Sequence, residues 1–262
     1  MRIVVFGLGK TGTTALFFKL KQAMAADTRW LFEPRSFIPE PTLPASILAK
    51  VLLGYNRDVD PTGFLAFDRL LFLTRDPRDT LVSRVLYDIY NETTICADDQ
   101  KVNAFVDLLR RKETDPPGTP LKDIIDVFDR MSQRPVLPRA VHDAGVALDF
   151  QRQNPRVFRY RYEDLVRADY TTIEPYLGLT LSREIATVPV EFTRVARTKQ
   201  AGNWRHWLTA ADVAFFEPWF SPYLAFNGYS DDWTLASEPR IPREHCSDYV
   251  LRLVIERRGM GV

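Results

Sequence analysis

The sequence has few of the residues that hold metal ions or form disulfide bonds. Its 262 residues include two cysteines, Cys96 and Cys246, and three histidines, His142, His206 and His245. Neither set has the spacing of a zinc site, and the cysteines lack the spacing of a redox pair. We therefore expect two free, buried thiols in a reducing compartment, and no metal ion at the functional site.

A large net charge and a long apolar run are also missing. The 35 basic and 34 acidic residues give a formal net charge of +1, so no overall field favours nucleic acid or an anionic membrane. No apolar run approaches transmembrane length, and the first expected strand begins at residue 2, which leaves no room for a signal peptide. We expect a cytoplasmic protein with no nucleic-acid partner and no membrane span. A membrane anchor trimmed from the sequence stays open, and the oligomeric state is unknown.

What the sequence does contain is enough apolar surface for a large core. Hydrophobic residues make up 45% of the chain and aromatic residues 12%, which fits one substantial α/β domain. The basic residues are 27 arginines and 8 lysines. Because a guanidinium is a planar fork, it suits two-point contacts with phosphate or sulfate, although a high-GC coding bias would give the same excess.

Strand and helix patterns alternate along the chain. Apolar runs predict strands that begin at residue 2 and that cover 30–32, 70–74 and 157–162. Helical spacing predicts helices over about 13–25, 45–53, 77–90, 121–131 and 136–152. Prolines and polar residues make 34–67 and 92–120 the segments expected to form mobile loops around a substrate. The alternation predicts a single α/β domain over 1–262, with a doubly wound parallel sheet flanked by helices.

A glycine-rich turn follows the first strand. Residues 6–14 read Phe-Gly-Leu-Gly-Lys-Thr-Gly-Thr-Thr. Glycines let the backbone approach an anion closely, and the first N–H groups of a helix favour negative charge. This predicts a phosphate-binding loop made of Gly9, Lys10, Thr11, Gly12, Thr13 and Thr14. The Walker A pattern of ATPases does not fit, because it needs a glycine where Val4 stands.

A second candidate segment starts where the strand over 70–74 ends. Asp76 is the expected N-cap of the next helix; Arg75 precedes it and Ser83 lies eight residues after Arg75. In a doubly wound sheet, ligands bind outside the carboxyl ends of the strands, so we expect Arg75 on the same edge as Lys10. The alternative is a capped helix start with Arg75 in a surface ion pair.

Three further segments carry candidate residues. Tyr162 opens a Tyr-Glu-Asp-Leu segment at the end of a strand, and residues 197–205 form a basic, glycine-containing turn. Leu31-Phe32-Glu33-Pro34 puts the carboxylate of Glu33 at the end of the second strand, where it could accept a proton from a hydroxyl group. Taken singly, these are also an ordinary strand exit, a solvated turn and an exposed glutamate. His142 and His206 are weaker candidates for the base.

In this order, the segments resemble those of the sulfotransferases that use 3'-phosphoadenosine 5'-phosphosulfate (PAPS), and they span 6–205. The resemblance implies a P-loop-like sulfotransferase fold, PAPS as sulfuryl donor, no metal, and release of adenosine 3',5'-bisphosphate (PAP). Phe-Glu-Pro resembles a segment of carbohydrate sulfotransferases, which favours an alcohol or carbohydrate acceptor over a phenol or an amine.

The resemblance also implies roles for individual residues. Lys10, Glu33 and Ser83 are the expected catalytic residues. The expected PAPS-binding residues are Gly9 to Thr14 of the loop together with Arg75, Ser83, Tyr162, Arg197, Lys199 and Gly202. Within 197–205, Thr198, Lys199 and Asn203 depart from the family's pattern, which weakens the expected backbone contacts. Ala15 stands where cytosolic members carry a tryptophan against adenine, which leaves Tyr162 as the aromatic residue best placed for that ring.

Two other functions stay open. A P-loop kinase or NTPase would share the fold, and Asp76 could be read as its magnesium ligand. A non-catalytic nucleotide-binding relative would bind PAPS without turnover, and Glu33 would then have no role.

Overall fold

A computed structural model describes residues 1–39, 44–54, 58–184 and 188–260 of the protein. They form two compact units. Unit 1 comprises Met1–Arg75 and His142–Thr193, and unit 2 comprises Asp76–Val141 and Arg194–Val262. Parts of the expected 34–67 loop, residues 40–43 and 55–57, lie outside the described residues.

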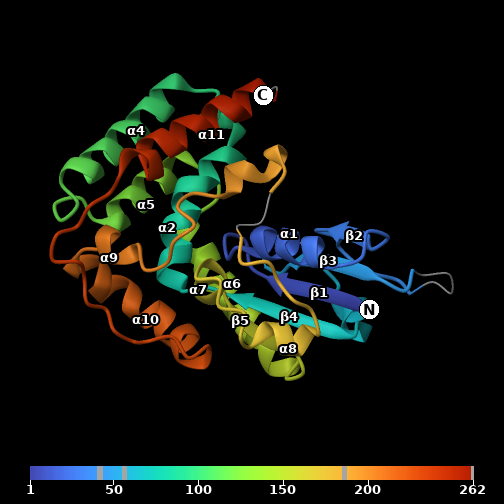
Figure 1. Ribbon diagram of the computed structural model, residues 1–262. Helices are drawn as coiled ribbons and strands as arrows, with labels where there is room; N and C mark the ends of the chain where they lie inside the picture. The colour runs from blue at the N-terminus through green and yellow to red at the C-terminus, as the bar shows by residue number, and fades with distance from the viewer. Residues whose placement is uncertain (40–43, 55–57, 185–187, 261–262) are drawn as a thin grey trace. The chain divides into compact units, whose positions relative to one another are not determined.

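Unit 1 holds a five-stranded sheet in which every neighbouring pair of strands is parallel (Figure 1). In spatial order its strands are β2 (Arg29–Phe32), β3 (Ile47–Leu52), β1 (Arg2–Gly7), β4 (Arg69–Thr74) and β5 (Phe158–Arg161). The first strand is central, and the chain adds strands on both of its sides. This is the doubly wound parallel arrangement that the sequence predicts.

Side chains that alternate along the central strands cover the two faces of the sheet. On one face, Ile3 and Val5 of β1 pack in one apolar cluster with Leu16 and Leu20 of α1 (Thr13–Ala23), which runs along the sheet in Figure 1. Phe6 and Phe72 lie on the other face, with ring centroids 4.7 and 6.0 Å from that of Phe150. Phe150 belongs to α6 (Val136–Gln153), which is part of unit 1 from His142 onward. Unit 1 also contains η1 (Thr62–Ala66), α7 (Tyr162–Val166) and α8 (Ile173–Leu177).

The helix expected over 45–53 is wrong, because Ile47–Leu52 forms β3. This strand pairs with β2 on one side and β1 on the other, and five of its six residues are buried. A parallel strand that is buried on both faces shows no apolar–polar alternation. Periodicity alone therefore does not distinguish it from a buried helix.

Unit 2 is helical. Its longer helices are α2 (Pro77–Tyr87), α4 (Asp99–Thr114), α5 (Leu121–Met131), α10 (Ala210–Phe226) and α11 (Ser247–Gly259), which pack around one apolar cluster (Figure 1). The shorter ones are η2 (Asp88–Asn91), α3 (Thr93–Cys96), α9 (Trp204–Trp207) and η4 (Arg243–His245), and η3 (Val190–Val195) spans the division between the units.

The loop expected over 92–120 is largely wrong, because α4 occupies Asp99–Thr114. Asp98 caps this helix by accepting the N–H groups of Gln100 and Lys101. Its apolar residues recur at helical spacing and are buried, namely Val102, Phe105, Val106 and Leu109. Polar residues on the opposite face obscured that amphipathic pattern.

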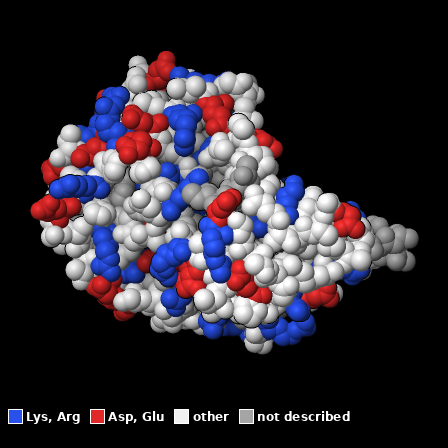
Figure 2. Space-filling view, in the orientation of Figure 1, with Lys and Arg blue, Asp and Glu red and all other residues white. Residues whose placement is uncertain are grey.

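Other sequence-based expectations are confirmed. Helices cover the predicted segments near 121–131 and 136–152, and Cys96 and Cys246 are free and buried. The described ranges contain no helix that is long and apolar enough to cross a bilayer, and no cluster of three or more His, Cys, Asp or Glu that could hold a metal ion. The expectations of no metal and no membrane span stay predictions. Basic and acidic side chains are interspersed over the face shown in Figure 2.

Candidate active site

The loop after β1 is closely packed on one side. The hydroxyl of Thr11 donates to the Leu8 carbonyl at 2.8 Å, and a Cβ added at Gly7 would lie 2.6 Å from Cγ2 of Thr13. A Cβ at Gly9 would meet no atom within 4 Å. The helix α1 begins after Gly12, which offers no side chain to cap its first N–H groups. The loop thus combines open space at Gly9 with a helix start that suits an anion.

Arg75 lies against this loop, as the sequence predicts. Its Nη1 donates to the Lys10 carbonyl at 2.9 Å, and the side chain is buried, with 6% of the residue exposed. The alternative of a surface ion pair is therefore wrong. The buried Nε of Arg75 has no hydrogen-bond partner among the described residues. A buried donor without an acceptor costs about 1–3 kcal/mol, so an anionic ligand that accepts this hydrogen bond would stabilise the arrangement.

Tyr162 joins Arg75 and the loop. Its ring centre is 4.3 Å from the guanidinium carbon of Arg75. Gly12 has a φ of +91°, and a Cβ at this position would lie 2.4 Å from Cδ2 of Tyr162. Glycine is required here both by its left-handed backbone and by the close approach of the ring. The structure brings Tyr162, Gly12 and Arg75 together, while a contact between Tyr162 and adenine stays a prediction.

Glu33 makes an ion pair that the sequence analysis missed. It follows β2 with a φ of +54°, and its Oε1 is 2.7 Å from Nζ of Lys50. Lys50 is a β3 residue that is only 2% exposed, and it also donates to Oγ1 of Thr14 at 2.9 Å. One buried ammonium therefore links the candidate base to the first turn of α1. A lysine inside an apolar run was the available signal, since buried lysines are rare.

The remaining predicted residues lie in unit 2. Ser83 is buried in α2, whereas Lys199 is exposed with a φ of +53°. Arg197 donates through Nη1 to the His245 carbonyl at 3.1 Å. The N–H of Gly202 donates within the protein, to the carboxylate of Asp79 at 2.6 Å, so it already has an acceptor. Binding of the 3'-phosphate by these four residues stays a prediction.

The histidines give no better candidate for the base. Nδ1 of His206 accepts the backbone N–H of Arg240 at 3.3 Å, which ties two segments of unit 2 together. His142 lies within α6. Glu33 is paired with Lys50 and joined through it to the loop. Its role as the base stays a prediction.

The comparisons with known proteins concern the fold. No family's sequence model matches the chain, and no curated protein matches it. The mouse sulfotransferase SULT7A1 in complex with PAP is similar in structure, with a TM-score of 0.53, 13% sequence identity, and coverage of 86% of this chain and 84% of that chain. A retinol dehydratase in complex with androsterone and the inactive cofactor PAP has a TM-score of 0.46, 17% identity, and coverage of 91% of this chain and 82% of that chain. The first likeness shows that this chain has the sulfotransferase fold.

Proposed function

We propose that the protein is a PAPS-dependent sulfotransferase that transfers a sulfuryl group to a hydroxyl group of its acceptor and releases PAP. The observation that carries the proposal is the contact of Arg75 with the Lys10 loop, 2.9 Å from the guanidinium to the Lys10 carbonyl. The loop suits one phosphate, and the buried Nε of Arg75 suits a second anionic oxygen beside it. PAPS carries two such groups on one adenosine, and PAPS also supplies the activated sulfuryl group.

The loop residues would stabilise negative charge at the 5' end of the ligand. Lys10 and the N–H groups of Thr11 to Thr14 would bind the phosphosulfate and the phosphate oxygen on which charge develops as the sulfuryl group departs. Arg75 would hold the 3'-phosphate, a role that the sequence pattern also assigns to Ser83 and Arg197. Cationic side chains and backbone N–H groups would supply these contacts.

Glu33 would accept the proton of the acceptor hydroxyl. The carboxylate takes this proton as the hydroxyl oxygen attacks sulfur, which raises the nucleophilicity of that oxygen at the moment of reaction. Lys50, fixed between Glu33 and Thr14, would hold the carboxylate in line with the loop and so contribute to alignment. Lys50 would therefore position Glu33, and Glu33 would carry the proton.

The kinase alternative is disfavoured by the state of Asp76. Its side chain accepts the N–H of Arg78 at 2.9 Å as the N-cap of α2, and Nη2 of Arg78 donates to Oδ2 of Asp76 at 2.8 Å. A carboxylate held in this way is poorly placed to bind magnesium. Val4 also stands where the Walker A pattern needs glycine.

A calorimetric titration with PAP beside ATP, with and without Mg²⁺, tests the class. We expect PAP to bind without Mg²⁺ and more tightly than ATP. Mg²⁺-dependent binding of ATP with no preference for PAP would contradict the proposal and favour the kinase. PAP binding combined with equal PAPS turnover by the wild type and Glu33→Gln would leave Glu33 without a catalytic role.

The acceptor that we propose is an alcohol, with a carbohydrate favoured by the Phe-Glu-Pro segment at Glu33. PAP release from PAPS should be followed with sugars, aliphatic alcohols, phenols and amines as acceptors. Turnover with phenols alone would contradict this acceptor class. We further propose a cytoplasmic location, because both buried thiols are free.

A further inference from the structure

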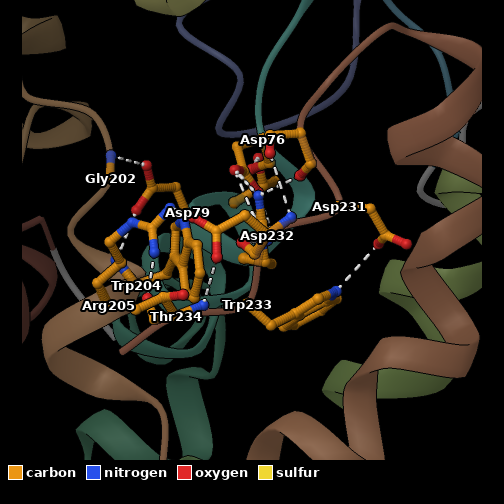
Figure 3. A network of polar contacts seen from close by, with 12 residues as sticks. Asp76, Asp79, Gly202, Trp204, Arg205, Asp231, Asp232, Trp233 and Thr234 are labelled. Carbon is orange, nitrogen blue, oxygen red and sulfur yellow. Dashed lines mark hydrogen bonds and ion pairs between the residues drawn. The ribbon is translucent and has the colours of Figure 1, made fainter. Parts of the chain in front are cut away.

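A buried carboxylate in unit 2 anchors the segment that carries Arg197 and Gly202. Asp79, in the first turn of α2, is 0% exposed. Its Oδ2 accepts the N–H of Gly202 at 2.6 Å and its Oδ1 accepts the N–H of Trp204 at 2.9 Å, as Figure 3 shows. Gly202 has a φ of +79°, so the chain turns sharply where it meets the carboxylate. One side chain thus fixes two N–H groups of a turn that is remote in sequence.

Arg78 reinforces this anchor from the neighbouring position of α2. Its guanidinium carbon lies 3.9 Å from the ring centre of Trp204 and 4.7 Å from that of Trp233. The same group donates to Asp76 and to the carbonyls of Ser230, at 3.1 Å, and Asp232, at 2.8 Å. The start of α2, the turn at Trp204 and the segment that contains Trp233 are therefore held together.

Arg205 adds a second link between the turn at Trp204 and the segment that contains Trp233 (Figure 3). Its Nη2 donates to Oδ2 of Asp232 at 2.8 Å, and its Nη1 donates to the Thr234 carbonyl. Hydrogen bonds from Thr234, and then the bond from Arg205, hold the pKa of the Asp232 carboxyl well below its usual range. The segment 230–234, which contains Trp233, is thus held by an ion pair and hydrogen bonds of its own.

The anchored turn belongs beside Ser83. Asp79 and Ser83 are four residues apart on α2, a spacing that puts two side chains on the same face of a helix. The turn held by Asp79 therefore meets the face of α2 that carries Ser83. Upstream in the same segment, Oγ1 of Thr198 accepts the N–H of Gln200 at 3.2 Å, so this stretch has internal order of its own.

We propose that Asp79 is a positioning residue that holds the segment 197–204 against α2 in the arrangement that binds the 3'-phosphate. The inference rests on the proposed function. Asp79 would act through the backbone of the segment, since its two oxygens accept the N–H groups of Gly202 and Trp204. It acts through the position of Arg197 relative to Ser83, and so governs selectivity for a nucleotide that carries a 3'-phosphate.

The test compares PAP with adenosine 5'-phosphate, which lacks the 3'-phosphate, by titration of the wild type, Asp79→Asn and Asp79→Ala. We expect affinity for PAP to fall about tenfold or more in Asp79→Ala, and affinity for adenosine 5'-phosphate to change less than about twofold. Asp79→Asn should fall between, since its amide oxygen can still accept one N–H group. With PAPS as substrate, KM should rise while kcat is retained.

Asp212 provides a matched control in the same unit. It is 1% exposed and accepts the N–H groups of Leu121 at 2.8 Å and Lys122 at 2.9 Å, which joins the starts of α5 and α10. Asp212→Asn should lower the melting temperature and leave the ratio of the two affinities unchanged. If the Asp79 variants behave in the same way, Asp79 is merely structural and the inference is wrong. If the wild type does not bind PAP more tightly than adenosine 5'-phosphate, the proposed function itself is contradicted, whatever the Asp79 variants do.

Hydrogen exchange on the wild-type protein keeps the inference testable if Asp79→Ala does not fold. The amides of Gly202 and Trp204 should exchange slowly before any nucleotide is added, because Asp79 already accepts both of them. Slow exchange that appears only with PAP would show that the segment is ordered by the ligand, and would overturn the positioning role.

Discussion

Arg75 and Arg78 stand in one short sequence motif, and the two units hold them in contrasting ways. Both are buried, with 6% and 3% of each residue exposed. In unit 1, Arg75 donates to the Lys10 carbonyl, while its buried Nε has no partner among the described residues. In unit 2, Arg78 donates from Nε, Nη1 and Nη2 and packs against two indole rings.

The hydrogen bonds of these two arginines give a criterion that separates ligand-binding side chains from structural ones. A guanidinium whose hydrogen bonds are all made within the protein stabilises the fold and has little left to offer a ligand. A guanidinium with a buried N–H group that has no acceptor in the protein gains a hydrogen bond when an anion binds. We therefore expect changes at the unit 1 residues Arg75, Glu33 and Lys50 to alter binding or turnover, and changes around Arg78 to alter stability.

Of the variants considered, Glu33→Gln should have the largest effect, and the effect should be on PAPS turnover. General base catalysis typically contributes about 10²–10⁴-fold, so we expect PAPS turnover to fall by about that factor. Affinity for PAP should change little, because the carboxylate of Glu33 is proposed to act on the acceptor hydroxyl and not on the nucleotide. Single-turnover kinetics and calorimetry separate the two quantities. A loss of PAP affinity as large as the loss of rate would place Glu33 among the binding residues instead.

Arg78→Ala should have the next largest effect, and the effect should be on the free energy of unfolding. Removal of Arg78 takes away the cation that pairs with the buried Asp76 carboxylate and opens a space beside Trp204 and Trp233. Breaking a buried pair in this way costs about 3–5 kcal/mol. Urea unfolding followed by tryptophan fluorescence measures this loss. A change below about 1 kcal/mol would show that Arg78 is not structural and would break the comparison.

Arg75→Ala should weaken PAP binding and have little effect on stability, the reverse of Arg78→Ala. Loss of charge-assisted hydrogen bonds to a phosphate costs about 1.5–3 kcal/mol of PAP binding, about 10- to 150-fold in affinity. Unfolding free energy should fall far less than in Arg78→Ala, because Arg75 loses one hydrogen bond to the described residues, at the Lys10 carbonyl, and its contact with the Tyr162 ring. The two variants, measured side by side in both assays, are each other's controls. Equal losses of stability would remove the distinction between the arginines.

The smallest effect is expected at Lys112, another buried cation, whose hydrogen bonds, like those of Arg78, are made within the protein. It is 0% exposed and donates to the carbonyls of Pro116 and Thr119, both at 2.7 Å. Burial lowers the pKa of this lysine from 10.5 to about 8. Between these values the unfolded chain holds the proton and the native state loses it, so stability should rise with pH.

The measurement is the unfolding free energy of the wild type minus that of Lys112→Met, which cancels other groups that titrate at alkaline pH. We expect the difference to shift in favour of the wild type by about 1 kcal/mol between pH 8 and pH 9. A difference that stays flat over this range would show that Lys112 keeps its proton, and that its cation is fully stabilised by the two carbonyls.

The parts of this molecule that could be predicted from the sequence are those with local causes. Glycines at a turn, a capping aspartate before proline and short apolar runs predict β1, α1, β4 and α2 at nearly their observed bounds. The strand β3 could not be distinguished from a helix, because a strand buried on both faces lacks alternation. That error also hid Lys50, since its pairing with Glu33 follows only from the register of β2 and β3.

The network around Arg78 could not be predicted, because its contacts cross more than a hundred residues of chain. The sequence indicates that Arg78 and Asp79 begin a helix, and that Trp204 ends a basic turn. Nothing local states that Asp79 accepts the N–H of Trp204, 125 residues away. Tertiary packing decides such pairs, and these pairs are what make Arg78 structural.

The most direct test of the account is the ratio of the dissociation constants for adenosine 5'-phosphate and PAP, measured by calorimetry for the wild type and Arg75→Ala. We expect a strong preference of the wild type for PAP, about tenfold or more, that is largely lost in Arg75→Ala while affinity for adenosine 5'-phosphate is retained. Equal affinities of the wild type for the two nucleotides, or a preference that survives in Arg75→Ala, would contradict it.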